Sequence, residues 1–356
     1  MSSHPRAEIS VTEPSKFLKP APMEGKGAYN RSSSVQAAGS LPAVALLERT
    51  AHAVALPPSP EGVIIADYGS SEGRNSLVPM TAAIGVLRKR VGNERAIFVF
   101  HADLPGNDFT ALFETLANDP DSYLRKDAAV FSAAIGRSYF EQILPASSVT
   151  LGWSAWAVQW LSRVPCAIPD QVQVAYSHDA TARSAFAQQA AEDWRTFLSM
   201  RSRELRPGAG MVVLTMAIDD DGDFGYRQVV DALYGALVDM ADRGLIRKEE
   251  FRRMAIPAFG RTRAQFTEPF AKPGVLQISL SRISNCSTAK MVSGLSLKQT
   301  ATLLHLGRNG LLSVALRYFQ RSLSVLMAYL ATRVRPSSST SWKPVLLYDS
   351  RQRRSE

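Results

Sequence analysis

Apolar runs that end at acidic or glycine-rich loops recur along this chain and alternate with stretches of helical period. The clearest run begins at Val63, where four apolar residues lead to Asp67 and then to a loop rich in Gly and Ser over 69–73. A helical pattern follows at 77–90. This order predicts a buried parallel strand, a tight turn and a helix.

The same kinds of pattern continue along the chain. Short apolar runs predict further strands at 96–100, 128–135, 148–153 and 211–216. Helical periodicity predicts helices at 34–55, 109–117, 180–206, 226–243 and 248–254. This alternation predicts an α/β fold with a mostly parallel, doubly wound sheet and helices on both faces.

Acidic residues stand at the carboxyl ends of the first two predicted strands, Asp67 and Asp103. Neighbouring strand ends of a doubly wound sheet meet at one crevice, where ligands of such folds bind. Asp103 is therefore a candidate acceptor for a ribose diol. The alternative is that Asp103 or Asp108 caps the helix predicted at 109–117.

The loop after Asp67 has room for a ligand, because Gly69 and Gly73 let the backbone come close to one. Its spacing matches neither the G-x-x-x-x-G-K-[ST] phosphate loop nor the G-x-G-x-x-G dinucleotide fingerprint. It suits S-adenosylmethionine, whose cation and amino group favour a carboxylate-lined loop without phosphate. The letters G-x-S-x-G also describe a nucleophile elbow at Ser71, which needs a later His; the candidates are His101, His178 and His305.

Three tryptophans follow the fourth predicted strand within eight residues, at 153, 156 and 160. The spacing of Trp156 and Trp160 predicts that they share one helix face. Core packing is one interpretation of such a cluster. The other is the wall of an apolar pocket, with Gln159 and the indole N–H groups as polar anchors.

Composition narrows the classes of protein. The 356 residues are 46% hydrophobic, which suffices for one large or two modest domains. The net charge of +9 is concentrated in residues 282–356, which contain twelve Lys and Arg but only two acidic residues. A general nucleic-acid-binding face on the rest of the chain is therefore not expected. No apolar run is long enough to predict a membrane span. The chain has only two cysteines, too few for a disulfide framework, and this favours a cytoplasmic location.

Two polar stretches are predicted to lie outside the packed core. Residues 1–22 are polar and aperiodic, so a mobile leader is expected. The acidic run at 219–223 lacks the register of a calcium loop and is expected to be a solvated loop.

Several motifs together resemble one family. Residues 29–36 are similar to S-Y-x-x-N-S-x-x-Q, residues 65–75 to I-A-D-L-G-C-S-S-G-P-N, and residues 103–109 match D-L-P-G-N-D-F. Residues 138–145, 153–162 and 201–210 resemble S-F-Y-G-R-L-F-P, H-S-S-Y-S-L-H-W-L-S and R-S-E-E-L-x-P-G-G. Over roughly 22–270 the chain thus resembles the SABATH family of S-adenosylmethionine-dependent carboxyl methyltransferases.

The resemblance implies a Rossmann-like class I methyltransferase core with a helical cap over the substrate pocket. It implies a methyl donor, S-adenosylmethionine, that leaves as S-adenosylhomocysteine, and a small-molecule carboxylic acid as substrate. The residues implied to line the donor site are Tyr29, Gln36, Asp67, Gly69, Ser70, Asn75, Asp103, Leu104, Ser138 and Tyr139. Those implied to hold or adjoin the substrate carboxylate are Gln36, Trp156, Gln159 and Trp160, with Gln36 and Trp160 orienting it.

Orientation is the chemistry that this resemblance requires. A carboxylate is already nucleophilic at neutral pH, so the protein needs only to desolvate it and aim it at the methyl group. The neutral donors Gln36 and Trp160 do this without quenching the nucleophile as an Arg would.

The departures from the family pattern have their own consequences. The larger ring of Trp156 and the additional Trp153 favour an apolar acid, so a fatty or isoprenoid acid competes with an aromatic one. Residues 252–257 lack the ligands of the family's D-x-F-N-I-P segment, and no metal is predicted. Beyond about residue 285 the resemblance ends. Three explanations are open: a shift of reading frame, a divergent tail, or a basic amphipathic helix at 311–335 that touches acidic lipid.

The expected organisation is a leader at 1–22, a donor-binding core at 23–220, a helical cap at 221–285 and a divergent basic segment at 286–356. The resemblance leaves open a homodimer. Two alternatives to the methyltransferase stand: a ligand-binding or inactive homologue, and a serine hydrolase on Ser71.

Overall fold

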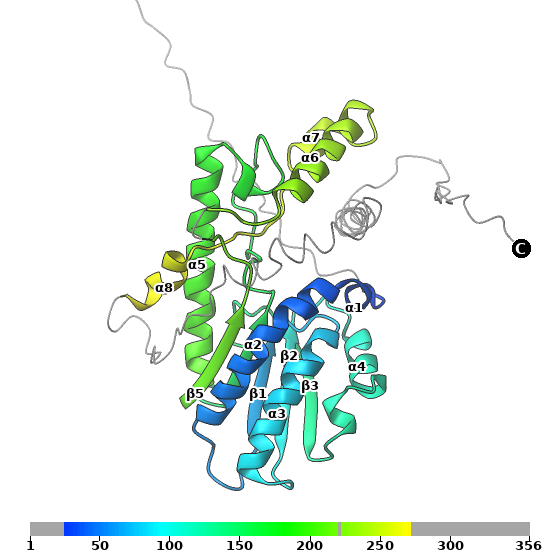
Figure 1. Ribbon diagram of the computed structural model, residues 1–356. Helices are drawn as coiled ribbons and strands as arrows, with labels where there is room; N and C mark the ends of the chain where they lie inside the picture. The colour runs from blue at the N-terminus through cyan, green and yellow to red at the C-terminus, as the bar shows by residue number, and fades with distance from the viewer. Residues whose placement is uncertain (1–24, 220–221, 272–356) are drawn as a thin grey trace, which may run out of the picture.

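Five parallel strands form a single open sheet in the computed structural model, which describes residues 25–219 and 222–271 (Figure 1). Their order is β3-β2-β1-β4-β5, so the chain reverses direction across the sheet between β1 and β4. Crevices at such reversal points are where open α/β sheets bind ligands. The strands are β1 Val63–Tyr68, β2 Ile97–Asp103, β3 Val130–Gly136, β4 Val149–Ala155 and β5 Leu205–Leu214.

Helices cover both faces of the sheet, as the alternating pattern predicts (Figure 1). On one face α2 (Ser34–Ala53), α3 (Leu77–Val91) and α4 (Phe109–Asn118) pack in one cluster with Ile65. On the other face α5 (Ala180–Glu204) packs its aromatic side chains against Tyr68 and Ala66. Side chains alternate between the two faces along β1, because successive residues of a strand point to opposite sides.

The smaller elements lie around this core. Figure 1 shows α6 and α7 beyond the end of the sheet toward which β5 points, and these helices share a separate hydrophobic cluster with Phe224 and Met254. Helix α6 spans Arg227–Asp242. The short helices are α1 Ala28–Ser32, η1 Arg74–Ser76, η2 Tyr123–Arg125, η3 Val174–Tyr176, α7 Lys248–Phe251, α8 Arg263–Thr267 and η4 Glu268–Phe270. The expected division into core and cap stays a prediction.

Two local predictions are wrong. Trp156 and Trp160 do not share a helix face, because residues 156–161 form a turn and Trp160 bridges to Ala258. Strand β5 begins at Leu205, six residues before the expected start, directly at the end of α5. Pro207 cannot donate a backbone hydrogen bond and ends the helix, so the chain enters the sheet at once.

Several expectations fall on residues outside the described part. These are the leader at 1–22, the segment at 286–356 and the helix at 311–335. In the acidic run, Asp219 and Asp223 close a turn in which the backbone N–H of Asp223 donates to the Asp219 carboxylate at 2.8 Å. None of the described helices is long and apolar enough to cross a membrane.

Candidate functional site

The loop between β1 and α3 brings its glycines close to side chains of neighbouring segments. Gly69 has φ +88°, and a Cβ there would lie 2.5 Å from the Cβ of Ala157. Gly73 has φ +83°, and its Cβ would lie 2.4 Å from a methyl carbon of Leu112. Between them Ser71 adopts φ +50°, a conformation that costs a non-glycine residue energy and that concentrates at functional sites. The sequence pattern located this turn correctly.

Asp67 stabilises the base of the loop through buried polar contacts. Its Oδ2 accepts a hydrogen bond from the Ser76 hydroxyl at 2.5 Å and lies 2.8 Å from Nδ1 of His101. The other ring nitrogen of His101 lies 2.7 Å from the Tyr123 hydroxyl, and all these side chains are buried. Both ring nitrogens of His101, a residue of β2, thus have partners, and neither partner is Ser71.

Asp103 holds the loop from the side. Its two carboxylate oxygens accept the backbone N–H groups of Ser71 and Leu104, each at 2.7 Å. Burial raises the pKa of this carboxyl, although the two N–H bonds act in the opposite direction. Asp108, not Asp103, caps α4, because its Oδ1 accepts the Ala111 N–H at 3.0 Å. The capping alternative therefore holds for Asp108 alone, and the ribose role of Asp103 stays a prediction.

Four buried side-chain atoms of α2 and of this loop have no hydrogen-bond partner within the described part of the chain: Gln36 Oε1, Ser70 Oγ, Ser71 Oγ and Glu72 Oε1. Buried polar atoms are normally paired, and exceptions demand an explanation such as a missing ligand. Three of the four belong to consecutive residues of the loop. The half-buried Asp103 carboxylate, which keeps lone pairs beyond the two N–H bonds it accepts, and the glycine turn beside it fit a ribose diol and a close backbone, so the residues present fit S-adenosylmethionine.

The N-terminal segment is fastened to the same loop. Asn75 donates through Nδ2 to the Tyr29 hydroxyl at 3.4 Å and to the Ser33 carbonyl at 3.5 Å. Asn30 donates through its backbone N–H to Glu72 Oε2 at 2.9 Å and through Nδ2 to the Glu72 carbonyl at 3.1 Å. The structure therefore brings Tyr29 and Asn75 together, as the resemblance implies.

The segment after β3 closes another side. The Tyr139 hydroxyl donates to the Ala157 carbonyl at 3.0 Å, and the ring lies close to Gly69. Ser138 accepts the Phe140 N–H at 3.3 Å, so its hydroxyl shapes the turn. Burial raises the pKa of Tyr139 well above its usual range.

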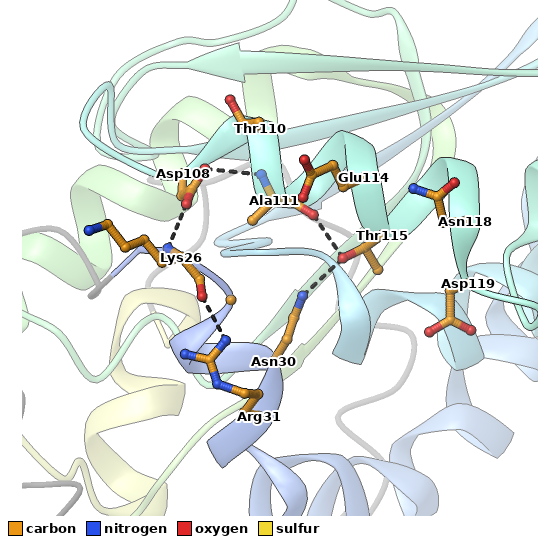
Figure 2. A pocket seen from close by; sticks show the side chains of 11 residues that line it. Lys26, Asn30, Arg31, Asp108, Thr110, Ala111, Glu114, Thr115, Asn118 and Asp119 are labelled. Carbon is orange, nitrogen blue, oxygen red and sulfur yellow. Dashed lines mark hydrogen bonds between the residues drawn. The ribbon is translucent and has the colours of Figure 1, made fainter.

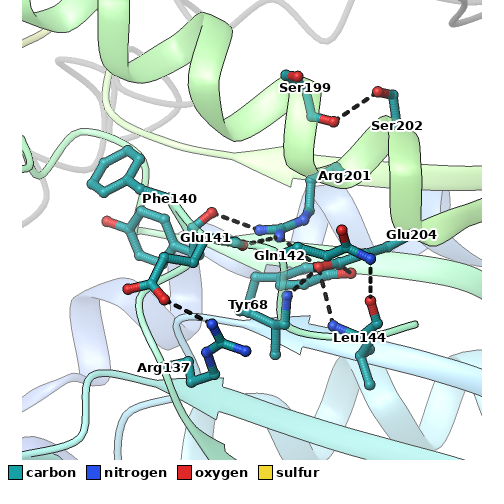
Figure 3. A network of polar contacts seen from close by, with 12 residues as sticks. Tyr68, Arg137, Phe140, Glu141, Gln142, Leu144, Ser199, Arg201, Ser202 and Glu204 are labelled. Carbon is teal, nitrogen blue, oxygen red and sulfur yellow. Dashed lines mark hydrogen bonds and ion pairs between the residues drawn. The ribbon is translucent and has the colours of Figure 1, made fainter. Parts of the chain in front are cut away.

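A buried ion pair holds this segment in place (Figure 3). Arg201 donates to the Tyr139 carbonyl at 2.7 Å and to Glu204 at 2.9 Å, and both charged side chains are fully buried. Glu204 also accepts the Tyr68 hydroxyl at 2.6 Å and the backbone N–H of Leu144 at 3.1 Å. Arg201 and Glu204 lie in the family motif at 201–210, but no pattern in the sequence connects them with Tyr139.

The tryptophan cluster divides into separate roles. Trp153 is 1% exposed and belongs to the main core, so the expectation that it shapes an apolar pocket is wrong. The Trp156 indole N–H donates to the Gln36 carbonyl and to the Ser40 hydroxyl, each at 3.0 Å. Trp156 has φ +56°, a second strained residue beside the Gly69 turn. Its ring nitrogen is therefore not free for a ligand.

Gln159 is equally engaged. Its Nε2 donates to the Trp156 carbonyl at 2.6 Å, and its Oε1 accepts the Thr215 hydroxyl at 2.9 Å. Its amide therefore braces the turn after β4. No hydrogen bond joins the Trp160 indole N–H to another described residue. Trp160 thus keeps a donor free, while Trp156 and Gln159 act through the shape of the turn.

Sequence reasoning missed Arg261, which holds the same turn from outside. It is 2% exposed and donates to the Val158 carbonyl at 2.7 Å and, through two nitrogens, to the Ala190 carbonyl at 3.2 and 2.7 Å. Burial lowers its pKa to about 10. No pattern in the sequence marks this contact, because its partners are carbonyl groups about 70 and 100 residues away.

Described residues also line two surface hollows, neither of which includes Asp67 or Asp103. One, of about 690 Å³, lies between α1 and α4, where Asn30 donates to Thr115 and Lys26 to Asp108 (Figure 2). The other, of about 240 Å³, lies between α2 and α3 beside Asn75. No cluster of three potential metal ligands occurs within 25–219 and 222–271, and the absence of a metal stays a prediction.

Comparison with known proteins agrees with this geometry. The family described as SAM-dependent carboxyl methyltransferases matches residues 19–313. Methyltransferase FUS9 of Gibberella fujikuroi is 30% identical over 243 residues, covering 68% of this chain and 64% of that protein. Salicylate carboxymethyltransferase of Clarkia breweri is 30% identical over 220 residues, covering 59% and 60%. The chain thus spans less than two thirds of the length of these relatives.

Among solved structures, a loganic acid methyltransferase with SAH superposes with a TM-score of 0.61 at 19% identity, over 87% of this chain and 94% of that one. At this identity the likeness concerns the fold. It confirms the Rossmann-like class I core that the motifs imply.

Proposed function

The chain belongs to the family of S-adenosylmethionine-dependent carboxyl methyltransferases, and from that membership we propose that it methylates a small-molecule carboxylic acid to its methyl ester. One observation carries the proposal. The glycine turn after β1 and the half-buried Asp103 carboxylate lie together at the carboxyl end of the sheet, where the strand order reverses and such folds bind ligands.

The donor side of the site takes its shape from the loop and its supports. Asp103 keeps further lone pairs on both oxygens beyond the N–H bonds that it accepts, so it remains able to receive a ribose diol. S-adenosylmethionine supplies an electrophilic methyl group on its sulfonium when bound. We assign the donor site to Tyr29, Gln36, Asp67, Gly69, Ser70, Asn75, Asp103, Leu104, Ser138 and Tyr139.

The acceptor side rests on Gln36 and Trp160. The outer end of the Gln36 amide is buried without a partner, and rotation of the amide places its NH₂ where its oxygen now lies. The free indole N–H of Trp160 is the second neutral donor. Together they orient a carboxylate without neutralising it, and no general base is needed because a carboxylate is deprotonated at neutral pH.

The size of the acid is the finer part of the proposal. With Trp153 in the core, the argument for an apolar acid rests on Trp156, whose ring lies against α2 close to Gly39. We keep fatty, isoprenoid and aromatic acids as candidate substrates. Equal turnover of benzoate-like and fatty acids would contradict the preference for an apolar tail.

The experiment is an assay of the purified full chain with methyl-labelled S-adenosylmethionine against carboxylic acids from fatty to aromatic. Trp160→Phe keeps the ring and removes the N–H, so we expect kcat/KM to fall about tenfold or more, as for the loss of a hydrogen bond to a charged group. The affinity for S-adenosylhomocysteine should not change. Labelled ester from no acid in the panel would contradict the proposal.

A second candidate is a homologue that binds ligand without turnover. The replacement of the family's Ser by Glu72 inside the donor loop favours it. Binding of S-adenosylhomocysteine without any labelled product would support this candidate over the enzyme. The serine hydrolase is not proposed, because the Ser71 hydroxyl has no His partner among the described residues and His101 is held by Asp67 and Tyr123.

The homodimer and the cytoplasmic location stay predictions. Light scattering on the full chain measures the first directly.

A further inference from the structure

Arg261 is a buried cation whose side-chain hydrogen bonds, among the described residues, all go to backbone carbonyl groups. It is 2% exposed, Nη1 donates to the Val158 carbonyl at 2.7 Å, and Nε and Nη2 donate to the Ala190 carbonyl at 3.2 and 2.7 Å. No carboxylate within 25–219 and 222–271 forms an ion pair with it. Burying a cation costs free energy unless its donors are matched by acceptors. These contacts therefore indicate a role beyond filling the core.

The two carbonyl groups that Arg261 joins belong to different elements. Val158 lies in the turn after β4, whereas Ala190 lies in α5. A guanidinium is planar and presents its N–H groups at fixed angles, so it sets the geometry between the groups that it bridges. A Lys ammonium has one nitrogen on a flexible stem and lacks this property. Arg261 therefore fastens the turn to α5 in a defined position.

A second buried charge, on α5 itself, holds the chain directly after the same turn. Asp193 is 4% exposed, and its carboxylate accepts the Ser162 N–H at 2.8 Å and the Ser162 hydroxyl at 2.7 Å. Burial lowers the pKa of Arg261 to about 10, and the charge of the nearby Asp193 acts in the opposite direction. Two opposite charges thus tie the chain to α5 at Val158 and at Ser162, on either side of Trp160.

The turn that these charges hold lies against the candidate donor site. A Cβ at Gly69 would lie 2.5 Å from the Cβ of Ala157, and the Tyr139 hydroxyl donates to the Ala157 carbonyl at 3.0 Å. The Trp156 indole N–H donates to the Gln36 carbonyl at 3.0 Å. The turn therefore contacts both the donor loop and a residue that we assign to the substrate carboxylate.

The segment that carries Arg261 also bonds to the backbone of the turn. The N–H of Leu161 donates to the Pro257 carbonyl at 2.7 Å, and the N–H of Phe259 donates to the Gln159 carbonyl at 2.9 Å. These bonds fix the backbone of residues 159–161, and the two buried charges fix where that backbone lies relative to α5.

We propose that Arg261 is a positioning residue, which together with Asp193 holds Trp160 where its indole N–H orients the substrate carboxylate. This inference rests on the proposed function and deepens it. Trp160 is half-buried, whereas Arg261 is buried and bonded to backbone, so Arg261 acts through the turn and not on the acid. An Arg in direct contact would pair with the carboxylate and weaken it as a nucleophile.

The test is a double-mutant cycle on the full chain, measured with the labelled-methyl assay and with calorimetry of S-adenosylhomocysteine. Arg261→Lys keeps the charge and removes the planar group that bridges two carbonyl groups. Trp160→Phe removes the indole N–H, and the third protein carries both changes. A double-mutant cycle isolates the part of one effect that passes through the other residue.

Arg88→Lys is the matched control. Arg88 is a largely buried Arg that also donates to backbone carbonyl groups, at 2.9 Å to Gly92 and at 3.2 Å to Ala129. Ala129 directly precedes β3, so these contacts lie at the amino end of the sheet, opposite to the candidate site. The control should lower Tm and leave kcat/KM and the Kd of S-adenosylhomocysteine unchanged.

We expect Arg261→Lys to lower kcat/KM for the acid about tenfold and to change the Kd of S-adenosylhomocysteine less than about twofold. In the Trp160→Phe background the same substitution should lower kcat/KM less than about threefold, because the N–H that Arg261 positions is already missing. Losses that multiply fully in the double variant, an unchanged kcat/KM in Arg261→Lys, or a tenfold weaker S-adenosylhomocysteine would each overturn the inference.

Ser162→Ala keeps the inference testable if Arg261→Lys does not fold. It removes the hydroxyl bond to Asp193 and leaves the bond from the Ser162 N–H in place. We expect kcat/KM to fall about threefold, and this loss should disappear in the Trp160→Phe background. The same loss in both backgrounds would contradict a role through Trp160.

Failure of this inference and failure of the proposed function give different results. If the full chain forms labelled ester and the losses of Arg261→Lys and Trp160→Phe multiply, only the role of Arg261 is wrong. If the full chain labels no acid, the proposed function is wrong and the inference falls with it.

Discussion

Single residues of the donor loop fix where a ligand is able to approach. Gly69 is tightly restricted, because both its φ of +88° and the 2.5 Å approach to Ala157 disfavour a side chain. Ser71 and Trp156 adopt positive φ beside it, at 50° and 56°. Strain of this kind persists only where the surrounding contacts hold it, and here Asp103 and the β5 backbone do so.

Gly69→Ala should therefore weaken S-adenosylhomocysteine at least tenfold and destabilise the fold by about 1–3 kcal/mol, through strain and overpacking. Calorimetry and urea unfolding measure the two effects. Gly92→Ala is the matched control, since Gly92 has φ +82° but open space around its Cβ position. The control should lose stability through φ alone and keep its ligand affinity. Equal affinities in both variants would contradict the role of the loop.

Asp103 gives the site a pH dependence. Because burial raises its pKa above the ordinary value for Asp, it takes up a proton at a higher pH than an exposed Asp does. A protonated carboxyl is a poorer acceptor for a ribose diol, so the affinity for S-adenosylhomocysteine should fall as the pH drops through this raised pKa. Asp103→Asn should bind weakly at every pH and lose that acidic limb. If the affinity of Asp103→Asn still falls at acidic pH, another group causes the pH dependence.

Elements position these residues through contacts outside the donor loop. Helix α5 carries Arg201 and Glu204 at its C-terminal end, where they fasten the segment after β3 to Tyr68 of β1 (Figure 3). In the family pattern Tyr68 is Leu, so the bond of its hydroxyl to Glu204 is an addition of this chain. Helix α5 thus serves both as a cover for the sheet and as the support of Tyr139.

Glu204→Ala should destabilise the protein by about 3–5 kcal/mol, because it leaves the Arg201 charge buried without its partner. Tyr68→Phe removes one hydrogen bond to a charged group and should cost about 1.5–3 kcal/mol. Asp239→Ala breaks a surface pair with Arg243, in which both side chains are more than 60% exposed, and should change stability by less than about 1 kcal/mol. Urea unfolding ranks the three, and a different order would contradict this account of the network.

The same network predicts behaviour in alkali. Burial raises the pKa of Tyr68 well above 10.0, and it also raises the pKa of Tyr123. The unfolded chain ionises these phenols near pH 10 while the folded protein does not. Stability is therefore intact below pH 10 and falls as the pH rises beyond it. Tyr68→Phe, though less stable at neutral pH, should show a shallower alkaline decline; an unchanged slope would exclude Tyr68 as a contributor.

The whole molecule couples ligand binding to stability, because the site joins the N-terminal segment, the sheet and the segment after β3. A ligand that binds only the folded state stabilises it by mass action. S-adenosylhomocysteine at one hundred times its Kd should add about 2.7 kcal/mol and raise Tm. At the same total ligand concentration, Gly69→Ala should show a smaller rise. No rise in the full chain would count against a donor site and against the ligand-binding homologue alike.

The sequence by itself determined the order and type of the main elements, the α/β class and the place of the donor loop. These follow from local chemistry. Apolar periodicity tells strand from helix, glycines at positive φ mark the turn, and an acid at a strand end marks the edge of the sheet. The family motifs extended this to the resemblance that the comparisons confirm, because their residues lie close together in the chain.

Only the tertiary structure decided which of those residues are free to meet a ligand. Trp153, Trp156 and Gln159 have side chains suited to contact a ligand. In the fold Trp153 packs in the core, whereas Trp156 and Gln159 donate hydrogen bonds to backbone carbonyl groups. Conversely Glu72 is buried, with one carboxylate oxygen that has no hydrogen-bond partner among the described residues, although its letter alone suggests an exposed charge. The reason is physical: pairing of a polar group depends on what lies beside it in space, and several of those partners come from distant segments, 42 residues away for Glu72 and 120 for Trp156.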